Sequence, residues 1–362
     1  MRLADQALSY VRAISPYQPG KPITELAREM GLPVDKIVKL ASNENPLGMS
    51  PRARQAVTAA IGGIERYPDQ FDLIRAVAER SGVDTGQVVL GNGSNDVLDL
   101  AARVFLAAGR SAVFSQHAFA VYPLATLSVG AEPIVVPARN FGHDLAAMAA
   151  AVRADTRIVW IANPNNPTGN FLPYPEVRAF LEDLPRDVVV VLDEAYTEYL
   201  PPAERADTAL WLKDFPNLVI TRTFSKIYGL AGLRVGYALA SAELADLMNR
   251  VRQPFNVNNL ALAAAVAALD DHLFVADSYE LNRRGLEQIV AGLKRLGFEH
   301  IPSHGNFVTF KAGDGAGINQ KLLRQGVIVR PIGGYGLPAW LRVTIGTEPE
   351  NARFLEALER AV

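Results

Sequence analysis

The stretch "DVVVVLDEAY", residues 187–196, indicates the fold. An unbroken run of valine and leucine is typical of a strand buried on both faces, as in a parallel sheet covered by helices on each side. Similar runs recur between residues 87 and 240, separated by helical patterns; they read "QVVL", "SAVFSQ", "EPIVVPA", "TRIVWIANP", "NLVITRTFSK" and "RVGYALA". We therefore predict an α/β fold with a mostly parallel central sheet.

The sequence pattern changes after "RQPFNVNN", residues 252–259. A long helical region at about 258–297 is followed by the strand-like runs "NFVTF", "VIVRPI" and "LRVTIG" and by a final helical stretch. Strands closed by a helix predict a smaller α+β domain. We expect an N-terminal segment at 1–45 that packs on the small domain, a large ligand-binding domain at 46–250 and a small C-terminal domain at 251–362.

Composition narrows the function classes. The 362 residues are 49% hydrophobic and 20% charged, which is typical of a soluble globular protein. A net charge of −2 gives no reason to expect a nucleic acid or an anionic membrane as partner. The chain has no cysteine, so thiol catalysis, disulfides and Cys-ligated metals are excluded.

The five histidines show no H-E-x-x-H pattern, and we expect no metal site. The first 20 residues lack a basic region followed by an apolar one, so they do not read as a secretory signal. The alanine-rich run at 260–269 is too short to cross a bilayer. We expect a cytoplasmic protein whose partners are small molecules.

Polar residues follow several of the predicted strands, at the sheet edge where open parallel sheets bind ligands. In "VVLGNGSND", the glycines, Ser94 and Asn95 precede an apolar helix. Backbone N–H groups at such a helix start can hold a phosphate, although an ordinary helix cap is an equally good interpretation. In "ANPNNPTG", Asn166 lies in a proline turn, where its amide could donate to a phenolate oxygen or simply be part of the turn.

Two charged residues at this edge are costly there unless they have a partner. Asp193 ends the valine-rich strand, and Tyr196 follows three residues later. A buried carboxylate needs a counter-charge, such as a protonated ring nitrogen, or backbone N–H groups. Lys226 follows the run "NLVITRTFS", with Arg234 in the glycine-rich segment beyond it. A lysine is usually a solvated cation, and it becomes a nucleophile only when its pKa falls.

Together these groups indicate one ligand. It would carry a phosphate, a phenolate oxygen, a ring nitrogen that needs a carboxylate, and an aldehyde that a lysine amine can attack. Pyridoxal 5′-phosphate (PLP) has all four groups.

The ordered motifs "GNGSND", "NPNNPTG", "DEAY", "TFSK" and "GLRVG" resemble the fold-type I, class I/II PLP-dependent aminotransferases, over essentially the whole chain. Within that family, "SPYQPG", "LASNENPLG", "RYPD", "VIVRPI" and "LRVTIGT" are similar to the enzymes that act on histidinol phosphate. The resemblance implies a large PLP-binding domain, a smaller domain and a homodimer.

The resemblance also implies a role for each matched cofactor residue. Lys226 would bond the aldehyde as a Schiff base and move the proton during transamination. Asp193 would pair with the ring nitrogen, Asn166 and Tyr196 would hold the phenolic oxygen, and Phe119 would stack on the ring, unless it is a plain core residue. The implied phosphate contacts are Ser94, Asn95, Thr223, Ser225, Arg234 and, from a neighbouring subunit, Tyr67.

The matched substrate positions are Tyr17, Asn43, Arg330 and Arg342. Arg342 would bind the carboxylate or an equivalent anion and Arg330 would add to a distal phosphate site, since guanidinium forks suit oxyanions. Residue alternation along "WLRVTIG" does not decide which way Arg342 points. His117 lies close to Phe119, and a structural role is favoured over a substrate contact.

The implied reaction is transamination in histidine biosynthesis. L-Glutamate would yield 2-oxoglutarate, and imidazole acetol phosphate would receive the amino group to become L-histidinol phosphate. The alternative is an aromatic aminotransferase acting on phenylalanine or tyrosine. A PLP-dependent decarboxylase of phosphorylated amino acids is less favoured. A PLP-binding regulator is disfavoured because the first 45 residues show no helix-turn-helix pattern and are not basic.

Overall fold

A seven-stranded sheet forms the larger layer of the computed structural model, which describes residues 2–362. The strand order is β2-β8-β7-β6-β5-β3-β4. The bounds are β2 (Val88–Gly91), β3 (Ser111–Ser115), β4 (Glu132–Val136), β5 (Thr156–Ala162), β6 (Val189–Asp193), β7 (Leu218–Thr223) and β8 (Gly236–Ala240). Only β8 runs antiparallel to its neighbours, so the predicted α/β fold with a mostly parallel sheet is confirmed.

The reversal at β8 agrees with a connection that contains no α-helix. A parallel crossover usually contains an α-helix. Between β7 and β8 the only regular element is the 3-10 turn Ala231–Leu233, so the chain returns antiparallel.

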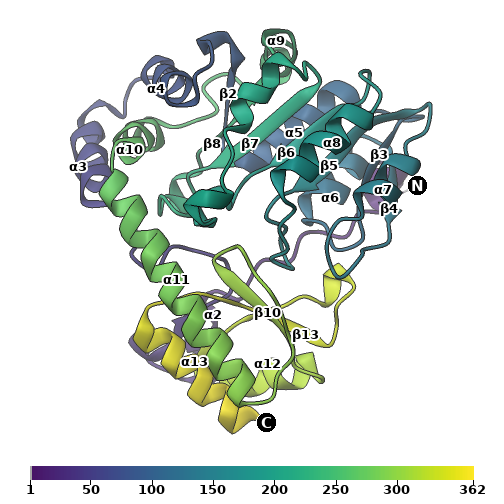
Figure 1. Cartoon of the computed structure of the whole chain (residues 1–362). Helices are drawn as coiled ribbons and strands as arrows, with labels where there is room; N and C mark the ends of the chain where they lie inside the picture. The colour runs from purple at the N-terminus through teal and green to yellow at the C-terminus, as the bar shows by residue number, and fades with distance from the viewer. Residues whose placement is uncertain (1) are drawn as a thin grey trace.

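Helices cover both faces of this sheet (Figure 1). Along β6, Val190 and Leu192 belong to one apolar core and Val189 and Val191 to the other, because successive side chains point to opposite faces. The layer helices are α3 (Pro51–Ala60), α4 (Phe71–Ser81), α5 (Ser94–Phe105), α6 (Val121–Ser128), α7 (Leu145–Ala150), α8 (Tyr174–Asp183) and α9 (Ala242–Val251). Burial on both faces explains why the strands read as continuous apolar runs.

The helical region expected at about 258–297 consists of two helices, α10 (Asn259–Leu269) and α11 (His272–Arg295). Asp271 caps α11 by accepting a hydrogen bond from Phe274 N, and the two axes differ by 81°. The alanines of α10 lie in a core of the large sheet, whereas α11 runs on to the smaller layer (Figure 1). Within residues 2–362 no single helix is long and apolar enough to cross a membrane; α10 and α11 meet that criterion only as a bent pair.

The smaller layer holds a four-stranded antiparallel sheet in the order β12-β13-β10-β9 and a parallel pair, β1 with β11. Its helices pack around a separate apolar core. The bounds are β1 (Val38–Lys39), β9 (His300–Ile301), β10 (Phe307–Lys311), β11 (Val327–Ile328), β12 (Arg330–Pro331), β13 (Trp340–Thr344), α12 (Gly315–Arg324) and α13 (Glu348–Ala361). Leu341, Arg342 and Val343 are all buried, so β13 is covered on both faces.

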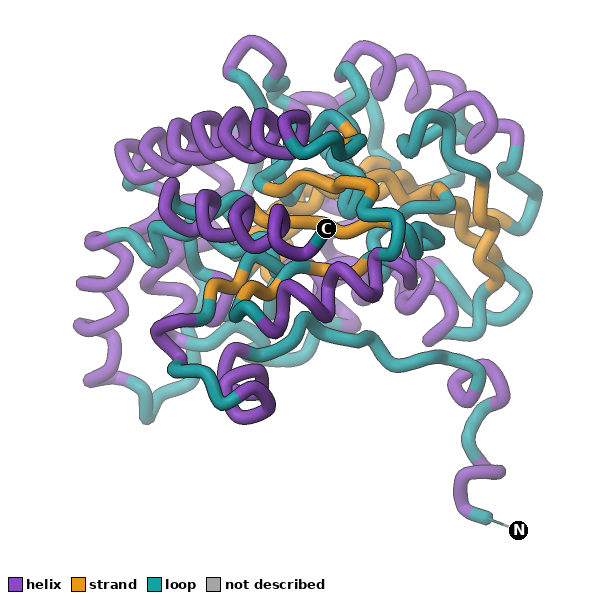
Figure 2. The backbone as a smooth tube through the Cα atoms, turned by 90° about the horizontal axis from the view of Figure 1, so that it is seen from below, coloured by secondary structure: helices purple, strands orange, loops and turns teal. Residues whose placement is uncertain are grey.

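The N-terminal segment contacts both layers. Helix α2 (Ile23–Met30) buries Leu26 against Leu323 and Ile328 of the smaller layer. Helix α1 (Ser9–Arg12) lies beside α6, and the ring of Tyr10 rests against Gly130. Figure 2 shows the residues before α2 running outward from the main body. The segment therefore connects the two layers along one side.

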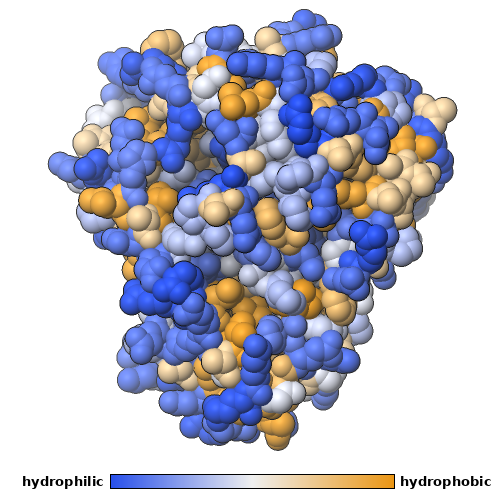
Figure 3. Space-filling view, in the orientation of Figure 1, coloured by the Kyte–Doolittle hydropathy of each residue, from blue (hydrophilic) through white to orange (hydrophobic). Residues whose placement is uncertain are grey.

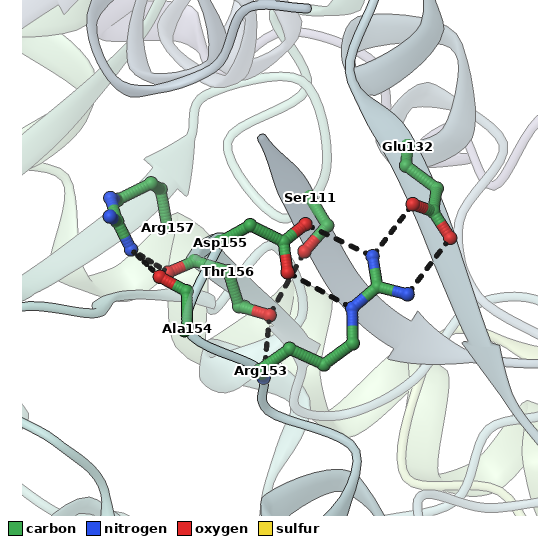
Figure 4. A network of polar contacts seen from close by, with 7 residues as sticks. All are labelled: Ser111, Glu132, Arg153, Ala154, Asp155, Thr156 and Arg157. Carbon is green, nitrogen blue, oxygen red and sulfur yellow. Dashed lines mark hydrogen bonds and ion pairs between the residues drawn. The ribbon is translucent and has the colours of Figure 1, made fainter. Parts of the chain in front are cut away.

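The amino-terminal edge of the large sheet is tied by a polar network (Figure 4). Arg153 donates to both carboxylate oxygens of Glu132, at 3.1 and 2.7 Å, and also to Asp155. The hydroxyls of Ser111 and Thr156 are 2.9 Å apart and link β3 to β5. The ion pairs are exposed, so they contribute little to stability. Their position leaves the carboxyl ends of the strands to the functional site.

Helix α11 needs glycine at position 285. A Cβ there would lie 2.4 Å from Ile345 Cγ2 and 2.9 Å from Asn351 Nδ2. Alanine improves helix propensity by about 1 kcal/mol, but overpacking costs about 1–3 kcal/mol. We expect Gly285→Ala to lower the free energy of unfolding by up to about 2 kcal/mol in urea titration. Ala291→Gly, at an exposed position of the same helix, gives the propensity term alone; a stabilised Gly285→Ala would contradict the expected clash.

Candidate active site

The carboxyl ends of β5, β6 and β7 open onto a cavity of about 200 Å³ between the two layers. Nearly all of the residues predicted to form the site line this one cavity. They are Tyr17, Asn43, Ser94, Asn95, Phe119, Asn166, Asp193, Tyr196, Thr223, Ser225, Lys226, Arg234, Arg330 and Arg342. Tyr67 does not line it.

An anion cradle forms where β2 turns into α5. Gly93 has φ 84°, and α5 begins at Ser94, so the first N–H groups of the helix have no intrahelical partner. A side chain at Gly93 would collide with the guanidinium of Arg234, which shows how closely this cation approaches the turn. Arg234 also donates to Ser225 Oγ at 3.4 Å. A helix start, a guanidinium and hydroxyls together suit a phosphate.

The buried carboxylate of Asp193 has one bonded and one free oxygen. The Tyr122 hydroxyl donates to Oδ2 at 2.9 Å, and Oδ1 has no hydrogen-bond partner among residues 2–362. Burial raises the pKa of Asp193 to about 6. A buried carboxylate among the residues that line the cavity fits a protonated ring nitrogen, as the sequence motifs predict.

Tyr196 accepts hydrogen bonds from two amides. Asn43 Nδ2 is 2.9 Å and Asn166 Nδ2 is 3.3 Å from the Tyr196 hydroxyl. Arg342 in turn donates to Asn166 Oδ1 and, at 2.9 Å, to the carbonyl oxygen of Ala41. This arrangement gathers donors at the place where a phenolic oxygen is expected.

The amine of Lys226 points into the same cavity. Nζ donates to the Ser42 carbonyl oxygen at 3.2 Å and lies 5.7 Å from the centre of the Tyr196 ring. Burial, helped by the positive charge of Arg342, lowers the pKa of Lys226 to about 8. A larger fraction of the amine is therefore neutral near neutral pH than in an exposed lysine, which suits a nucleophile.

Aromatic rings form the wall beside Asp193. Phe119 lines the cavity and meets Tyr122 edge-on, with ring centres 5.8 Å apart. Tyr122 stacks on Trp160 at 5.3 Å with nearly parallel rings. An aromatic face at this wall suits a planar heterocycle.

Two arginines face each other on the small-layer strands. Arg330 and Arg342 are direct partners in the β12–β13 ladder. Arg330 donates to the Gln18 carbonyl oxygen at 2.6 Å, and its guanidinium lies 5.5 Å from the Tyr17 ring centre. Neither arginine forms an ion pair within the described part of the chain, 2–362, so both can accept an anion.

His117 and Tyr67 lie apart from the cavity lining. The buried His117 ring donates through Nδ1 to the Tyr335 carbonyl oxygen at 2.7 Å, which joins the two layers. Tyr67 is 80% exposed and stacks on Phe255. Its predicted contact with a neighbouring subunit stays a prediction.

Sequence reasoning missed Tyr122 and Tyr335. Tyr335 lines the cavity beside the two arginines, and Tyr122 reaches Asp193 across 71 positions of the chain. Tyr122 lies in an apolar helix, where its hydroxyl gives no sequence signal that distinguishes it from a core tyrosine. The residues present therefore fit PLP at every group, with Tyr122 as an added partner.

Comparison with known proteins supplies independent findings. A family model described as "Aminotransferase class I and II" matches residues 35–358. Histidinol-phosphate aminotransferase 1 of Dechloromonas aromatica (strain RCB) is 85% identical, over 100% of both chains. Histidinol-phosphate aminotransferase 2 of Nitrosospira multiformis is 61% identical, over 100% of this chain and 93% of that protein. The structure of histidinol-phosphate aminotransferase from Sinorhizobium meliloti in complex with pyridoxal-5′-phosphate superposes with a TM-score of 0.91, at 28% identity, over 98% of this chain and 97% of that chain.

The lowered pKa of Lys226 predicts the pH dependence of cofactor capture. Only the neutral amine attacks an aldehyde, so the rate at which the cofactor-free protein binds PLP covalently should rise through a pH of about 8. Stopped-flow absorbance of the protein-bound cofactor measures this rate. Arg342→Gln should move the midpoint upward, because a neighbouring cation is removed. A midpoint near the unperturbed lysine value of about 10.4 would contradict the burial effect.

The hydrogen bond from Tyr122 to Asp193 predicts a second effect. Tyr122→Phe leaves the buried carboxylate without this donor, and such bonds to charged groups are worth about 1.5–3 kcal/mol. We expect the single-turnover rate of amino-group transfer to fall about tenfold or more. Tyr279→Phe, which removes a hydroxyl outside the cavity, is the matched control. An unchanged rate in Tyr122→Phe would show that Oδ2 needs no donor.

Proposed function

The chain belongs to the class I and II aminotransferases. From that premise we propose that it transfers an amino group reversibly from L-glutamate to imidazole acetol phosphate. The products are 2-oxoglutarate and L-histidinol phosphate. The reaction uses PLP and serves histidine biosynthesis. Full-length similarity to enzymes of that name supports this assignment, as does the fit of the cavity to the cofactor.

Two guanidiniums that form no ion pair among residues 2–362 support the substrate assignment. Arg330 and Arg342 are adjacent across two strands and share the cavity with Lys226. The anion cradle at α5 is a separate set of donors, so the cavity has anion-binding groups for a substrate besides those for the cofactor phosphate. At the end remote from the amino group, histidinol phosphate carries a phosphate and glutamate a carboxylate, whereas phenylalanine carries an apolar ring.

PLP, when bound, supplies an aldehyde that takes up the amino group and a ring that delocalises the resulting electron pair. The chain's residues orient it. Asp193 would hold the proton on the ring nitrogen, Tyr196 and Asn166 would bind the phenolic oxygen, and Phe119 would pack on the ring face. The cavity-lining residues that would hold the phosphate group are Ser94, Asn95, Thr223, Ser225 and Arg234.

Lys226 acts both as nucleophile and as proton carrier in this proposal. Its neutral amine would hold the cofactor through the aldehyde group, and the free amine would carry the proton to and from the substrate carbon that bears the nitrogen. The Lys226 pKa of about 8 supports both roles, because the amine can lose and regain a proton near neutral pH.

We also propose a homodimer in which Tyr67 of each copy contacts the cofactor phosphate of the other. The support is a set of large apolar side chains with substantial exposure near α3 and α4: Leu47, Ile61, Ile64, Tyr67, Phe71 and Phe255. Figure 3 shows apolar residues at its left edge, at the level of α3. Exposed apolar groups of this kind often mark a protein interface. The cytoplasmic location stays a prediction.

Other functions fit the cavity less well. An aromatic aminotransferase would use the same cofactor residues, but its substrate ring would leave Arg330 without an anion. A decarboxylase of phosphorylated amino acids could use both arginines. It differs from an aminotransferase in releasing carbon dioxide. A PLP-binding regulator is less favoured because the similar proteins named above, which match this chain over its full length, are named as aminotransferases.

The substrate assignment predicts a difference in half-reaction rates. We expect histidinol phosphate to convert the protein-bound cofactor faster than phenylalanine does, as followed by its visible absorbance in a single turnover. Arg330→Gln should lower kcat/KM for histidinol phosphate about 10- to 100-fold, the range for a lost charge-assisted hydrogen bond, and leave phenylalanine less affected.

Arg324→Gln serves as the control, because Arg324 is an exposed arginine at the end of α12. Faster conversion by phenylalanine would make the protein an aromatic aminotransferase. Release of carbon dioxide from a phosphorylated amino acid would favour the decarboxylase.

A further inference from the structure

Two exposed aromatic rings stack beside α4. The rings of Tyr67 and Phe255 are 4.5 Å apart at 21°, although Tyr67 is 80% and Phe255 51% exposed. Phe255 also has φ 56°, a left-handed backbone conformation that is unfavourable for a residue with a Cβ. A strained backbone at Phe255, together with the stacking of its exposed ring on Tyr67, indicates that Phe255 has a specific structural role.

The residues around Phe255 hold its backbone in place. The Asn256 side chain accepts hydrogen bonds from Gln70 at 3.0 Å and from Arg252 at 2.9 Å. Its amide group donates to the Leu90 carbonyl oxygen at 3.0 Å and to Asp96 Oδ2 at 2.8 Å. With both ends of its side chain engaged, Asn256 restrains the backbone next to Phe255.

The same network reaches the phosphate turn. Asp96 Oδ2, which binds Asn256, also accepts a hydrogen bond from Asn92 N at 2.8 Å. Asn92 lies in the turn that leads to Ser94 and Asn95 at the start of α5. The segment that carries Phe255 is therefore anchored to the chain's own anion cradle.

The backbone before Tyr67 is held by the same segment. Asn259 Nδ2 donates to the Arg66 carbonyl oxygen at 2.8 Å. Tyr67 is thus restrained at its backbone by Asn259 and at its ring by Phe255. Residues 255–259, here called the bridging segment, contact Tyr67 and its preceding carbonyl through Phe255 and Asn259, and reach the phosphate turn through Asn256.

We propose that the bridging segment pre-positions Tyr67 for the cofactor phosphate of a second copy of this chain, with Phe255 as the positioning residue. The inference rests on the proposed homodimer and adds to it a residue that never touches the cofactor. Stacking removes rotamer freedom from the Tyr67 ring before the copies meet, so less entropy is lost when its hydroxyl meets the phosphate.

The test measures how fast the holoenzyme releases PLP after dilution, by the loss of visible absorbance. Phe255→Ala should release PLP about three- to tenfold faster, the range expected for one aromatic stack. Phe255→Tyr, which keeps the ring, should release it at the native rate. Phe255→Gly relieves the left-handed strain but lacks the ring, so it should behave like Phe255→Ala. Leu210→Ala, with a similar exposure of 48%, is the control.

Mixed dimers identify the copy in which Phe255 acts. Lys226→Ala removes the covalent cofactor band from one copy, so only the other copy's site is observed. When the observed copy carries Phe255→Ala, release should be native, because its Tyr67 comes from the other copy. When Phe255→Ala is on the Lys226→Ala copy, release should be fast. The reverse pattern would overturn the inference.

Tyr67→Phe separates the two proposals. If it speeds PLP release while Phe255→Ala does not, the dimer contact stands and the role of Phe255 is wrong. If Tyr67→Phe has no effect, both the contact and this inference are wrong. Pyridoxal, which lacks the phosphate, should dissociate from native and Phe255→Ala protein at equal rates; a difference would show that Phe255 acts on something other than the phosphate.

Discussion

A carboxylate buried at the end of β6 is the constraint around which the site is arranged. Asp193 cannot stay ionised in an apolar sheet edge unless something compensates the loss of water. Tyr122 donates a hydrogen bond to Oδ2, and Oδ1 is itself buried and has no hydrogen-bond partner among residues 2–362. The charge of Asp193 is therefore incompletely compensated by the described residues, which is consistent with the proposed pairing to a cationic ring nitrogen. Tyr122 is held in position to donate this hydrogen bond because its ring is fully buried against Trp160.

The charge of the next residue, Glu194, is compensated by groups of the protein itself. Glu194 is fully buried, and Arg222 donates to its Oε2 at 2.9 Å from the neighbouring strand β7. Thr208 and Tyr174 add hydroxyl donors. The ion pair fixes β6 to β7 at the level where Asp193 enters the cavity, and it neutralises a second charge that would otherwise repel Asp193. Removal of either partner would leave an uncompensated buried charge, which is the costly case.

Both layers contribute to the cavity, so cofactor and substrate groups depend on how the layers meet. Asn43 has a left-handed backbone at φ 56°, which directs its amide to Tyr196. Arg342 reaches from β13 to Asn166 on the large layer. His117 and Tyr335 form a further link. Arg342, proposed to bind substrate, is thereby connected to Asn166 and Tyr196, proposed to bind the phenolic oxygen, and a shift of one layer would move both sets.

The sequence by itself determined the α/β class, the order of the motifs and most of the cavity lining, because apolar runs and the residues that follow them are local patterns. Lys226, Asp193 and Arg234 could be predicted since the carboxyl ends of parallel strands meet at one edge. Only the tertiary structure decided that Tyr122 bonds Asp193, that β13 buries Arg342 between two covered faces, and that Phe255 stacks on Tyr67. These contacts join residues far apart in the chain, and their energies depend on burial and direction, which local sequence does not encode.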